Sequence, residues 1–247
     1  MICVEDFHKA YDRHVAVEGL SLAVVAGQIL GLVGPNGAGK TTTLRTLAGI
    51  IPPSRGKLAV AGHDVQREAV AAKRALGYIS DDPQLFPDLT VEQHLAFFAS
   101  AYAVADAAAK ADELLGTFEL ASHRKTAARD LSRGMRQMLG ICCAYLHDPN
   151  VVLFDEPLTG LDSHGIRTIK RTIVGRDVAG ASVIVSSHLL AIVEDICTDV
   201  LVLMNGKQRF LGPLEELKGT FGDAEQDSSL KEIFFRATEP PSPLVVY

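Results

Sequence analysis

The sequence predicts an α/β fold in which a mostly parallel sheet is combined with a small antiparallel β part and an inserted helical part. Three apolar runs carry this prediction. Residues 29–33 lead into a glycine-rich loop and a helix, residues 151–154 are followed by two acidic residues, and residues 182–186 follow a helical stretch. Fully apolar strands that alternate with helices are typical of a parallel sheet buried on both faces.

The first third of the chain predicts the antiparallel part. Residues 1 to about 28 alternate short apolar and polar runs, and residues 57–62 add another strand candidate. We expect these strands to form a small sheet beside the glycine-rich loop. Between them, residues 40–50 are predicted to be a helix that Pro52 and Pro53 stop. A strand at 76–80 follows.

The middle of the chain predicts helices. Thr90, followed by Gln93, has the pattern of a capping box, and alanine-rich stretches continue to about residue 118. A further helix is expected from Arg133 to Leu146. Residues 83–146 therefore look like a helical insertion between two strands of the α/β core.

After residue 156 the alternation of strands and helices returns. We expect a helix near 164–177, a strand at 182–186, and a hairpin at 199–211 that turns at Asn205 and Gly206. The proline-rich tail near 239–243 is expected to be mobile. We therefore predict one domain over 1–247, with a core (1–82 and 147–215), a helical part (83–146) and a C-terminal helix and tail (216–247).

Composition narrows the class of protein. The net charge of −6 and the pI near 5.7 disfavour nucleic acid as a partner, because phosphate backbones are held by basic surfaces. No apolar run reaches the length of a membrane-spanning helix, and the start of the sequence lacks a secretory pattern. The four cysteines, without C-x-x-C spacing, are expected to be reduced thiols in the core. These features predict a cytoplasmic protein.

The most informative feature is the segment 34–42, which reads GPNGAGKTT and matches the phosphate-binding pattern G-x-x-x-x-G-K-[ST]. Glycines allow the backbone N–H groups to point inward, so that a triphosphate can lie at the helix N-terminus. Lys40 is expected to reach the β- and γ-phosphates, and Thr41 to bind Mg²⁺. The predicted nucleotide-binding residues of the loop are Gly34, Asn36, Gly37, Ala38, Gly39, Lys40, Thr41 and Thr42.

A second motif ends the apolar strand at 151–154. Asp155 is placed to hold Mg²⁺, directly or through water, and Glu156 could polarise the attacking water. A strand that merely ends in two solvated acids is the alternative. Pro157 stops the strand in either case.

Twenty residues before this acidic pair, residues 131–137 read LSRGMRQ. At this point the chain resembles the nucleotide-binding subunits of ABC transporters, whose signature reads L-S-G-G-Q. The resemblance covers almost the whole chain, with its motifs in the family's order. It implies a P-loop NTPase fold of the ABC ATPase type, with a RecA-like sheet. It also implies roles for Tyr11, the loop 34–42, the linker 80–82, the signature, Asp155 and Glu156, Gly160 to Asp162, and His188.

The resemblance assigns further site residues. Tyr11 would stack on the adenine with Val17 packed nearby, and His188 would hold the γ-phosphate and the attacking water. Ser132 and Gly134 would meet the nucleotide of a second subunit in trans, and Asp162 would lie at the dimer seam. Taken alone, Tyr11 could be a core aromatic, the signature a capped helix start, and His188 a solvated strand end.

Three positions depart from the family pattern. Arg133 and Met135 stand at the third and fifth positions of the signature, and Arg133 resembles variation in export-type branches of the family. Asp81 stands where the family usually has glutamine. A carboxylate there could still reach Mg²⁺ but cannot donate a hydrogen bond.

The resemblance implies an ATPase whose two copies, or one copy and a paralogue, close around two ATP molecules with Mg²⁺. Because the chain has no spanning segment of its own, it would drive a separate transmembrane permease, contacted near residues 82–102, at the cytoplasmic face of the plasma membrane. Residues 227–236 resemble the end of export-type (ABC-2-like) subunits. The alternatives are a non-transport ABC ATPase of the iron–sulfur assembly type and a catalytically impaired nucleotide-binding regulator. The candidate contact residues are Phe86, Leu89, Leu95, Phe97 and Phe98.

Overall fold

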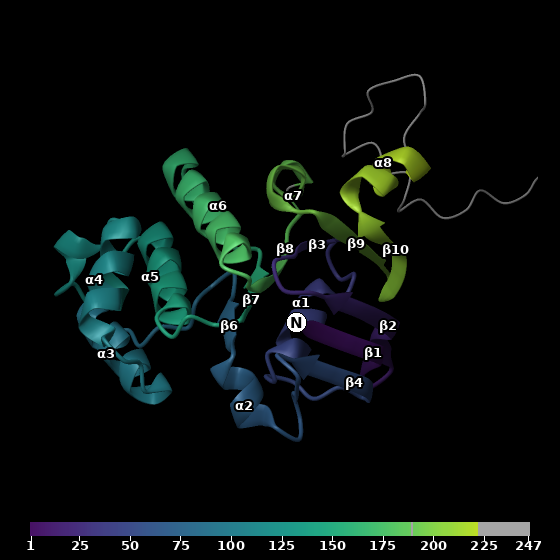
Figure 1. Ribbon diagram of the computed structural model, residues 1–247, viewed down its shortest axis with the longest axis horizontal. Coiled ribbons are helices and arrows are strands. Elements are labelled where there is room, and N and C mark those ends of the chain that lie inside the picture. Colours follow the sequence, from purple (N-terminus) through teal and green to yellow (C-terminus); the bar gives the residue numbers. More distant parts are fainter. Residues whose placement is uncertain (189, 222–247) are drawn as a thin grey trace, which may run out of the picture.

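A computed structural model describes residues 1–188 and 190–221 of the chain. Two sheets lie next to each other, and a group of helices extends from the far side of the larger sheet (Figure 1). The larger sheet is mostly parallel and the smaller one is antiparallel, which confirms the predicted fold class.

The smaller sheet is built from the N-terminal quarter of the chain. Its strand order is β2-β1-β4-β5, and every pair is antiparallel. Register shifts interrupt β1 near its middle, where Asp6 adopts a positive φ of 46°. The irregularity bends the strand, as β-bulges do. The strands are β1 (Ile2–Tyr11), β2 (His14–Val24), β4 (Arg55–Val60) and β5 (His63–Asp64).

The larger sheet has the order β10-β9-β3-β8-β7-β6. Strands β9, β3, β8, β7 and β6 run parallel, and β10 closes one edge as the antiparallel partner of β9. The three central strands are buried along their whole length, as their apolar runs predict. The strands are β3 (Ile29–Val33), β6 (Leu76–Ile79), β7 (Val151–Asp155), β8 (Ser182–Ser186), β9 (Asp199–Met204) and β10 (Lys207–Pro213).

Hydrophobic cores cover both faces of the larger sheet. On one face, side chains of the central strands pack with the smaller sheet and with α1. On the other face, they pack with α5, α6 and α7. The helices outside the helical part are α1 (Lys40–Leu47), α2 (Ala69–Arg74), α6 (Ser163–Val178), α7 (Leu190–Ile196) and α8 (Leu214–Phe221).

The helical part lies beside the β6 edge (Figure 1). It contains α3 (Val91–Tyr102), α4 (Ala107–Thr117) and α5 (Arg133–Tyr145), with short 3₁₀ turns at Ala121–His123 and Ala128–Asp130. The capping box at Thr90 is present, with both reciprocal hydrogen bonds. Residues 83–90 are not helical, contrary to the prediction, because Pro83 and Pro87 bias the residues before them away from helical dihedrals.

Several boundaries differ from the predicted ones. The helix expected to reach residue 50 ends at Leu47, because Gly49 adopts a φ of +63° and ends the helix. The short helices α2 and α7 were not expected from the sequence. α8 begins at Leu214, inside the predicted core, so the division of the chain into core, helical part and C-terminal part stays a prediction. The segments 227–236 and 239–243 lie outside the described residues.

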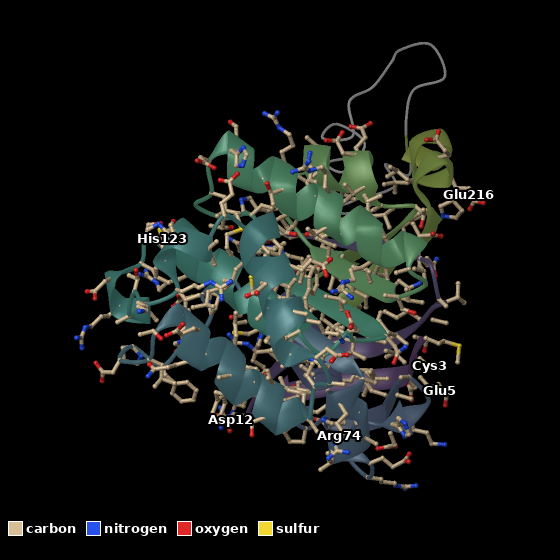
Figure 2. The ribbon with its side chains drawn as sticks, turned by 60° about the vertical axis from the view of Figure 1, so that its left-hand side comes forward. Cys3, Glu5, Asp12, Arg74, His123 and Glu216 are labelled. Carbon is tan, nitrogen blue, oxygen red and sulfur yellow. The ribbon has the colours of Figure 1, made fainter. Side chains whose placement is uncertain are left out.

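Three of the four cysteines agree with the prediction of core thiols. All four are free, and Cys142, Cys143 and Cys197 are buried, whereas Cys3 is only partly buried because it lies on a strand of the smaller sheet. Cys3 lies near the molecular surface beside Glu5 (Figure 2), which accepts a long hydrogen bond from its thiol at 3.9 Å. Burial raises the pKa of Cys197 to about 12 and also raises that of Cys142. Such thiols stay protonated and unreactive at neutral pH.

Candidate functional site

The phosphate loop lies between β3 and α1, at the carboxyl end of a central strand. Gly37 and Gly39 adopt φ values of +79° and +104°, which favour glycine. A Cβ atom on Gly34 would lie 2.4 Å from the carbonyl oxygen of Leu203, so that position also excludes a side chain. No side chain caps the first turn of α1, and its N–H groups are therefore available to an anion.

Lys40 is folded against the loop that precedes it. Its ammonium group donates hydrogen bonds to the carbonyl oxygens of Gly34 at 2.7 Å and Pro35 at 3.2 Å. Burial lowers the pKa of Lys40, and the charges of Glu156 and Asp155 oppose that shift. The positive charge is thus held at the loop where the sequence predicts phosphate.

Asp155 ends β7 and is almost completely buried. Its Oδ1 accepts hydrogen bonds from the hydroxyls of Thr41 at 3.1 Å and Ser186 at 2.8 Å, and its Oδ2 accepts one from Tyr78 at 3.4 Å. Burial raises the pKa of the Asp155 carboxyl. The structure thereby brings together Thr41 and Asp155, two of the three predicted metal ligands, from distant parts of the chain.

The chemistry of this pair fits Mg²⁺. A carboxylate and a hydroxyl are hard oxygen donors, and Mg²⁺ is usually bound by one or two carboxylates together with substrate phosphates and water. Within residues 1–188 and 190–221, no three His, Cys, Asp or Glu side chains form a metal-binding cluster.

Glu156 and His188 contact each other. Oε2 of Glu156 lies 2.7 Å from Nδ1 of His188 and also accepts a hydrogen bond from the His188 backbone N–H at 3.3 Å. Glu156 has a positive φ of 50° and its own N–H donates to Ser186. If the Nδ1–H donates to the carboxylate, Nε2 is left for another partner. His188 and Asn36 line a hollow of about 240 Å³ at the phosphate loop.

The predicted adenine-binding residues lie on the smaller sheet. Tyr11 ends β1 with an exposed fraction of 45 %, and the Lys9 ammonium lies 4.9 Å from the centre of its ring. Val17 is fully buried. A Cβ atom on Gly39 would lie 3.0 Å from a Val17 methyl, so Val17 packs directly beneath the phosphate loop.

The signature lies apart from the phosphate loop of the same chain. Ser132 caps α5 by accepting a hydrogen bond from the Met135 N–H at 3.2 Å. Asp162 likewise accepts a hydrogen bond from the Gly165 N–H at 2.8 Å. A hollow of about 510 Å³ is lined by Ser132, Gly134 and Asp162, and it shares no residue with the hollow at the phosphate loop.

Two departures from the family pattern have distinct surroundings. The Arg133 side chain lies against Gly160, where a Cβ atom would approach its Cδ to 3.1 Å. Asp81 is exposed after β6, and its negative charge raises the pKa of Asp155. The predicted metal-binding role of Asp81 stays a prediction.

Three residues near the site were not identified from the sequence. Ser186 bonds Asp155 and Glu156 because the parallel register of β7 and β8 pairs Asp155 with Ser186. Buried Gln137 of α5 donates to the carbonyl of Ser80 at 3.1 Å and so ties the signature helix to the end of β6. Tyr78 contacts Asp155 from the neighbouring strand. Strand order and register reveal the contacts of Ser186 and Tyr78, and the packing of α5 against the end of β6 reveals that of Gln137.

Comparisons with known proteins agree with this geometry. The model of the family described as "ABC transporter" matches residues 17–159. The chain is 32 % identical to the ABC-type transporter ATP-binding protein EcsA of Bacillus subtilis, over 97 % of each chain. It is 33 % identical to the Nod factor export ATP-binding protein I of Cupriavidus metallidurans, over 96 % of this chain and 78 % of that protein. A solved structure of an ATP-binding subunit of an ABC transporter superimposes with a TM-score of 0.90 at 30 % identity, covering 97 % of this chain and all of that one.

Proposed function

The chain belongs to the ABC transporter family, and from this premise we propose how its site works and what it drives. It is an ATP-binding subunit with ATPase activity coupled to transport. The finer proposal is that two copies, or one copy and a paralogue, close around two ATP molecules to power export through a separate permease. The separation of the signature hollow from the phosphate loop supports a site completed by a second copy, and the contact between Glu156 and His188 supports hydrolysis at that loop.

Hydrolysis would use the residues that surround the γ-phosphate. The first turn of α1 and Lys40 hold the phosphates by N–H groups and positive charge. Thr41 and Asp155 would bind Mg²⁺, which when bound supplies positive charge that neutralises the phosphate oxygens. Glu156 orients the attacking water and accepts its proton while the bond between the γ-phosphorus and the leaving oxygen breaks. His188 fixes the Glu156 carboxylate through their 2.7 Å contact.

A second subunit would complete the site. The signature residues Ser132 and Gly134 lie at the N-terminus of α5, on a different hollow from the phosphate loop. A helix N-terminus presents partial positive charge, and from a neighbouring subunit it would stabilise charge on the γ-phosphate. Asp162, beside the same hollow, would lie at the seam between subunits.

We propose that the helical part contacts the permease. Phe86 and Phe97 each expose 48 % of their surface and pack against each other with ring centres 5.2 Å apart. Leu89 and Phe98 are half-buried. Leu95 is 2 % exposed, so this member of the predicted contact set belongs to the core instead.

The proposed permease would determine where in the cell the protein is located. No helix within the described ranges has the length and apolar character needed to cross a bilayer. Attachment through a transmembrane partner would place the chain at the cytoplasmic face of the plasma membrane. Export is the direction proposed, because one relative is named for Nod factor export and another for daunorubicin resistance.

The first test measures ATP turnover at increasing protein concentration, together with the size of the protein in ATP. If a second subunit completes the site, the total rate of ATP hydrolysis should rise faster than linearly with protein concentration. Glu156→Gln keeps the shape of the side chain but removes the proton acceptor, so turnover is expected to fall at least a hundredfold while an ATP-loaded dimer accumulates.

Glu113→Gln supplies the matched control, since this exposed side chain lies on α4 and has no place in the proposed site. It should leave turnover and size unchanged. A turnover rate per subunit that does not depend on protein concentration would refute the two-subunit mechanism and favour a regulator. Normal turnover in Glu156→Gln would have the same meaning.

A further inference from the structure

Tyr78 is a half-buried contact of the metal-binding carboxylate that the proposed mechanism does not use. It lies on β6, the edge strand of the larger sheet, which pairs with β7 so that Tyr78 stands opposite Leu153. Its hydroxyl reaches forward to Oδ2 of Asp155, at 3.4 Å. The other oxygen of Asp155 is already bonded by Thr41 and Ser186. Tyr78 is thus the partner of the one carboxylate oxygen that these two hydroxyls leave open.

The hydroxyl of Tyr78 can donate to this oxygen. A phenolic hydroxyl carries one proton and an ionised carboxylate only accepts, so the hydrogen bond runs from Tyr78 to Asp155. The same hydroxyl interacts with the guanidinium of Arg45, on α1. The chain Arg45–Tyr78–Asp155 therefore joins α1, β6 and β7 through side chains.

The same tyrosine lines a groove outside the nucleotide site. This groove, of about 360 Å³, follows the edge of β6 and is bounded by the end of α1, by α3 and by α5. The proposed permease surface on the helical part adjoins it through Phe98. Tyr78 therefore touches the groove and the metal-binding carboxylate together. Asp81 is the next acidic residue along the chain. When charged, its carboxylate carries no proton, so it cannot make the hydrogen bond to Asp155 that Tyr78 makes.

We propose that Tyr78 is a positioning residue that orients the Asp155 carboxylate for Mg²⁺ and links the groove beside β6 to the metal site. This inference rests on the proposed function of Asp155. Hydrogen-bond partners of metal-ligating carboxylates commonly affect metal affinity by 10- to 100-fold. The distance of 3.4 Å is longer than a strong O–H···O bond, and contacts of this kind tighten when the ligand binds. We therefore expect that loss of the Tyr78 hydroxyl lowers the affinity for Mg²⁺ by about three- to tenfold.

The test measures the affinity of a non-hydrolysable fluorescent ATP analogue, once with Mg²⁺ and once with EDTA. The ratio of the two dissociation constants reports what the metal adds to binding, independently of turnover. Tyr78→Phe, which removes only the hydroxyl, should reduce this ratio about three- to tenfold while the affinity in EDTA stays the same. Arg45→Gln should also reduce this ratio. Because this variant leaves Tyr78 unchanged, its result does not depend on whether the fold tolerates a substitution at Tyr78.

Tyr145→Phe is the matched control, because it removes a different tyrosine hydroxyl, one that is buried in the core of the helical part. Its ratio should equal that of the wild type. Equal ratios for the wild type, Tyr78→Phe and Arg45→Gln would overturn the role of Tyr78 and leave the ATPase proposal intact. A wild-type chain whose affinity does not respond to Mg²⁺ would overturn both.

Discussion

At Gly34, the first residue of the phosphate loop, one additional methyl group meets the backbone of a neighbouring strand. A Cβ atom there would lie 2.4 Å from the carbonyl oxygen of Leu203 and 3.0 Å from the Cβ of Ala38. The Leu203 carbonyl belongs to β9 and cannot yield, so Gly34→Ala must displace the loop and the carbonyl to which Lys40 donates. We expect nucleotide affinity to fall at least tenfold in a fluorescence titration.

The control for this prediction is a glycine with free space. Gly175 lies exposed inside α6, and a Cβ atom there would meet nothing within 4 Å. Because alanine favours helix over glycine by about 0.5–1 kcal/mol, Gly175→Ala should raise the free energy of unfolding by that amount. It should not change nucleotide affinity. Normal affinity in Gly34→Ala would mean that the loop can shift without consequence.

Individual residues also show how far the sequence alone predicts the site. The loop 34–42 and the acidic pair were found because their chemistry depends on residues that are adjacent in sequence. The structure adds the 2.7 Å contact between Glu156 and His188, which the sequence could not measure. Ser186 and Tyr78 were missed because each meets Asp155 only through the pairing of neighbouring strands, and serine and tyrosine at strand positions have no distinctive pattern.

Among the elements, α5 begins at a residue with two proposed tasks. Ser132 caps the helix through its bond from the Met135 N–H, and it would also meet the nucleotide of a second subunit. Ser132→Ala removes both. Loss of an N-cap costs about 1 kcal/mol, so urea unfolding should show that decrease, and ATP turnover at a protein concentration that supports dimers should fall at least tenfold.

Ser132→Asn separates the two tasks. Asparagine caps helices about as well as serine, so the free energy of unfolding should stay within a few tenths of a kcal/mol of the wild type. Its larger amide replaces the small hydroxyl proposed to face the phosphate, and turnover should still be lost. If Ser132→Asn retains turnover, Ser132 acts only as a helix cap. The signature would then be a capped helix start without a role at the phosphate.

The elements differ in how well the sequence predicts them. The strands β3, β7 and β8 were predicted because burial on both faces requires four or five apolar or small residues in a row. The helices α2 and α7, with six and seven residues, are too short to establish a helical repeat of apolar positions. Their formation depends on packing against the sheet, which a local pattern does not contain.

For the whole molecule, two cores on opposite faces of one sheet place several ionisable groups in apolar surroundings. Cys142, Cys143 and Cys197 lie in the same core as α5, α6 and α7. Burial raises the pKa of Cys197 from an ordinary value of 9.0 to about 12, and the pKa values of Cys142 and Cys143 are raised as well. Above pH 9, the fold therefore keeps protonated three thiols that would ionise in the unfolded chain.

This burial predicts a loss of stability in alkaline solution. Below pH 9 the thiols are protonated in both states, so their contribution to the free energy of unfolding is fully present. As the pH rises from 9 towards 12, only the unfolded chain releases these protons, and each thiol then lowers the free energy of unfolding by about 1.4 kcal/mol per pH unit. Between pH 8 and pH 10, urea unfolding should therefore reveal a decrease of about 4 kcal/mol for the three thiols together.

Two cysteine variants distinguish this cause from a general effect of charge. Cys197→Ala lowers stability at pH 7 because it leaves a small cavity, but it removes one of the three ionising groups, so the decrease between pH 8 and pH 10 should shrink by about a third. Cys3→Ala, near the surface, should leave the decrease unchanged. An equal pH dependence in the wild type and Cys197→Ala would show that repulsion among surface charges, and not the buried thiols, limits the stability of the fold at high pH.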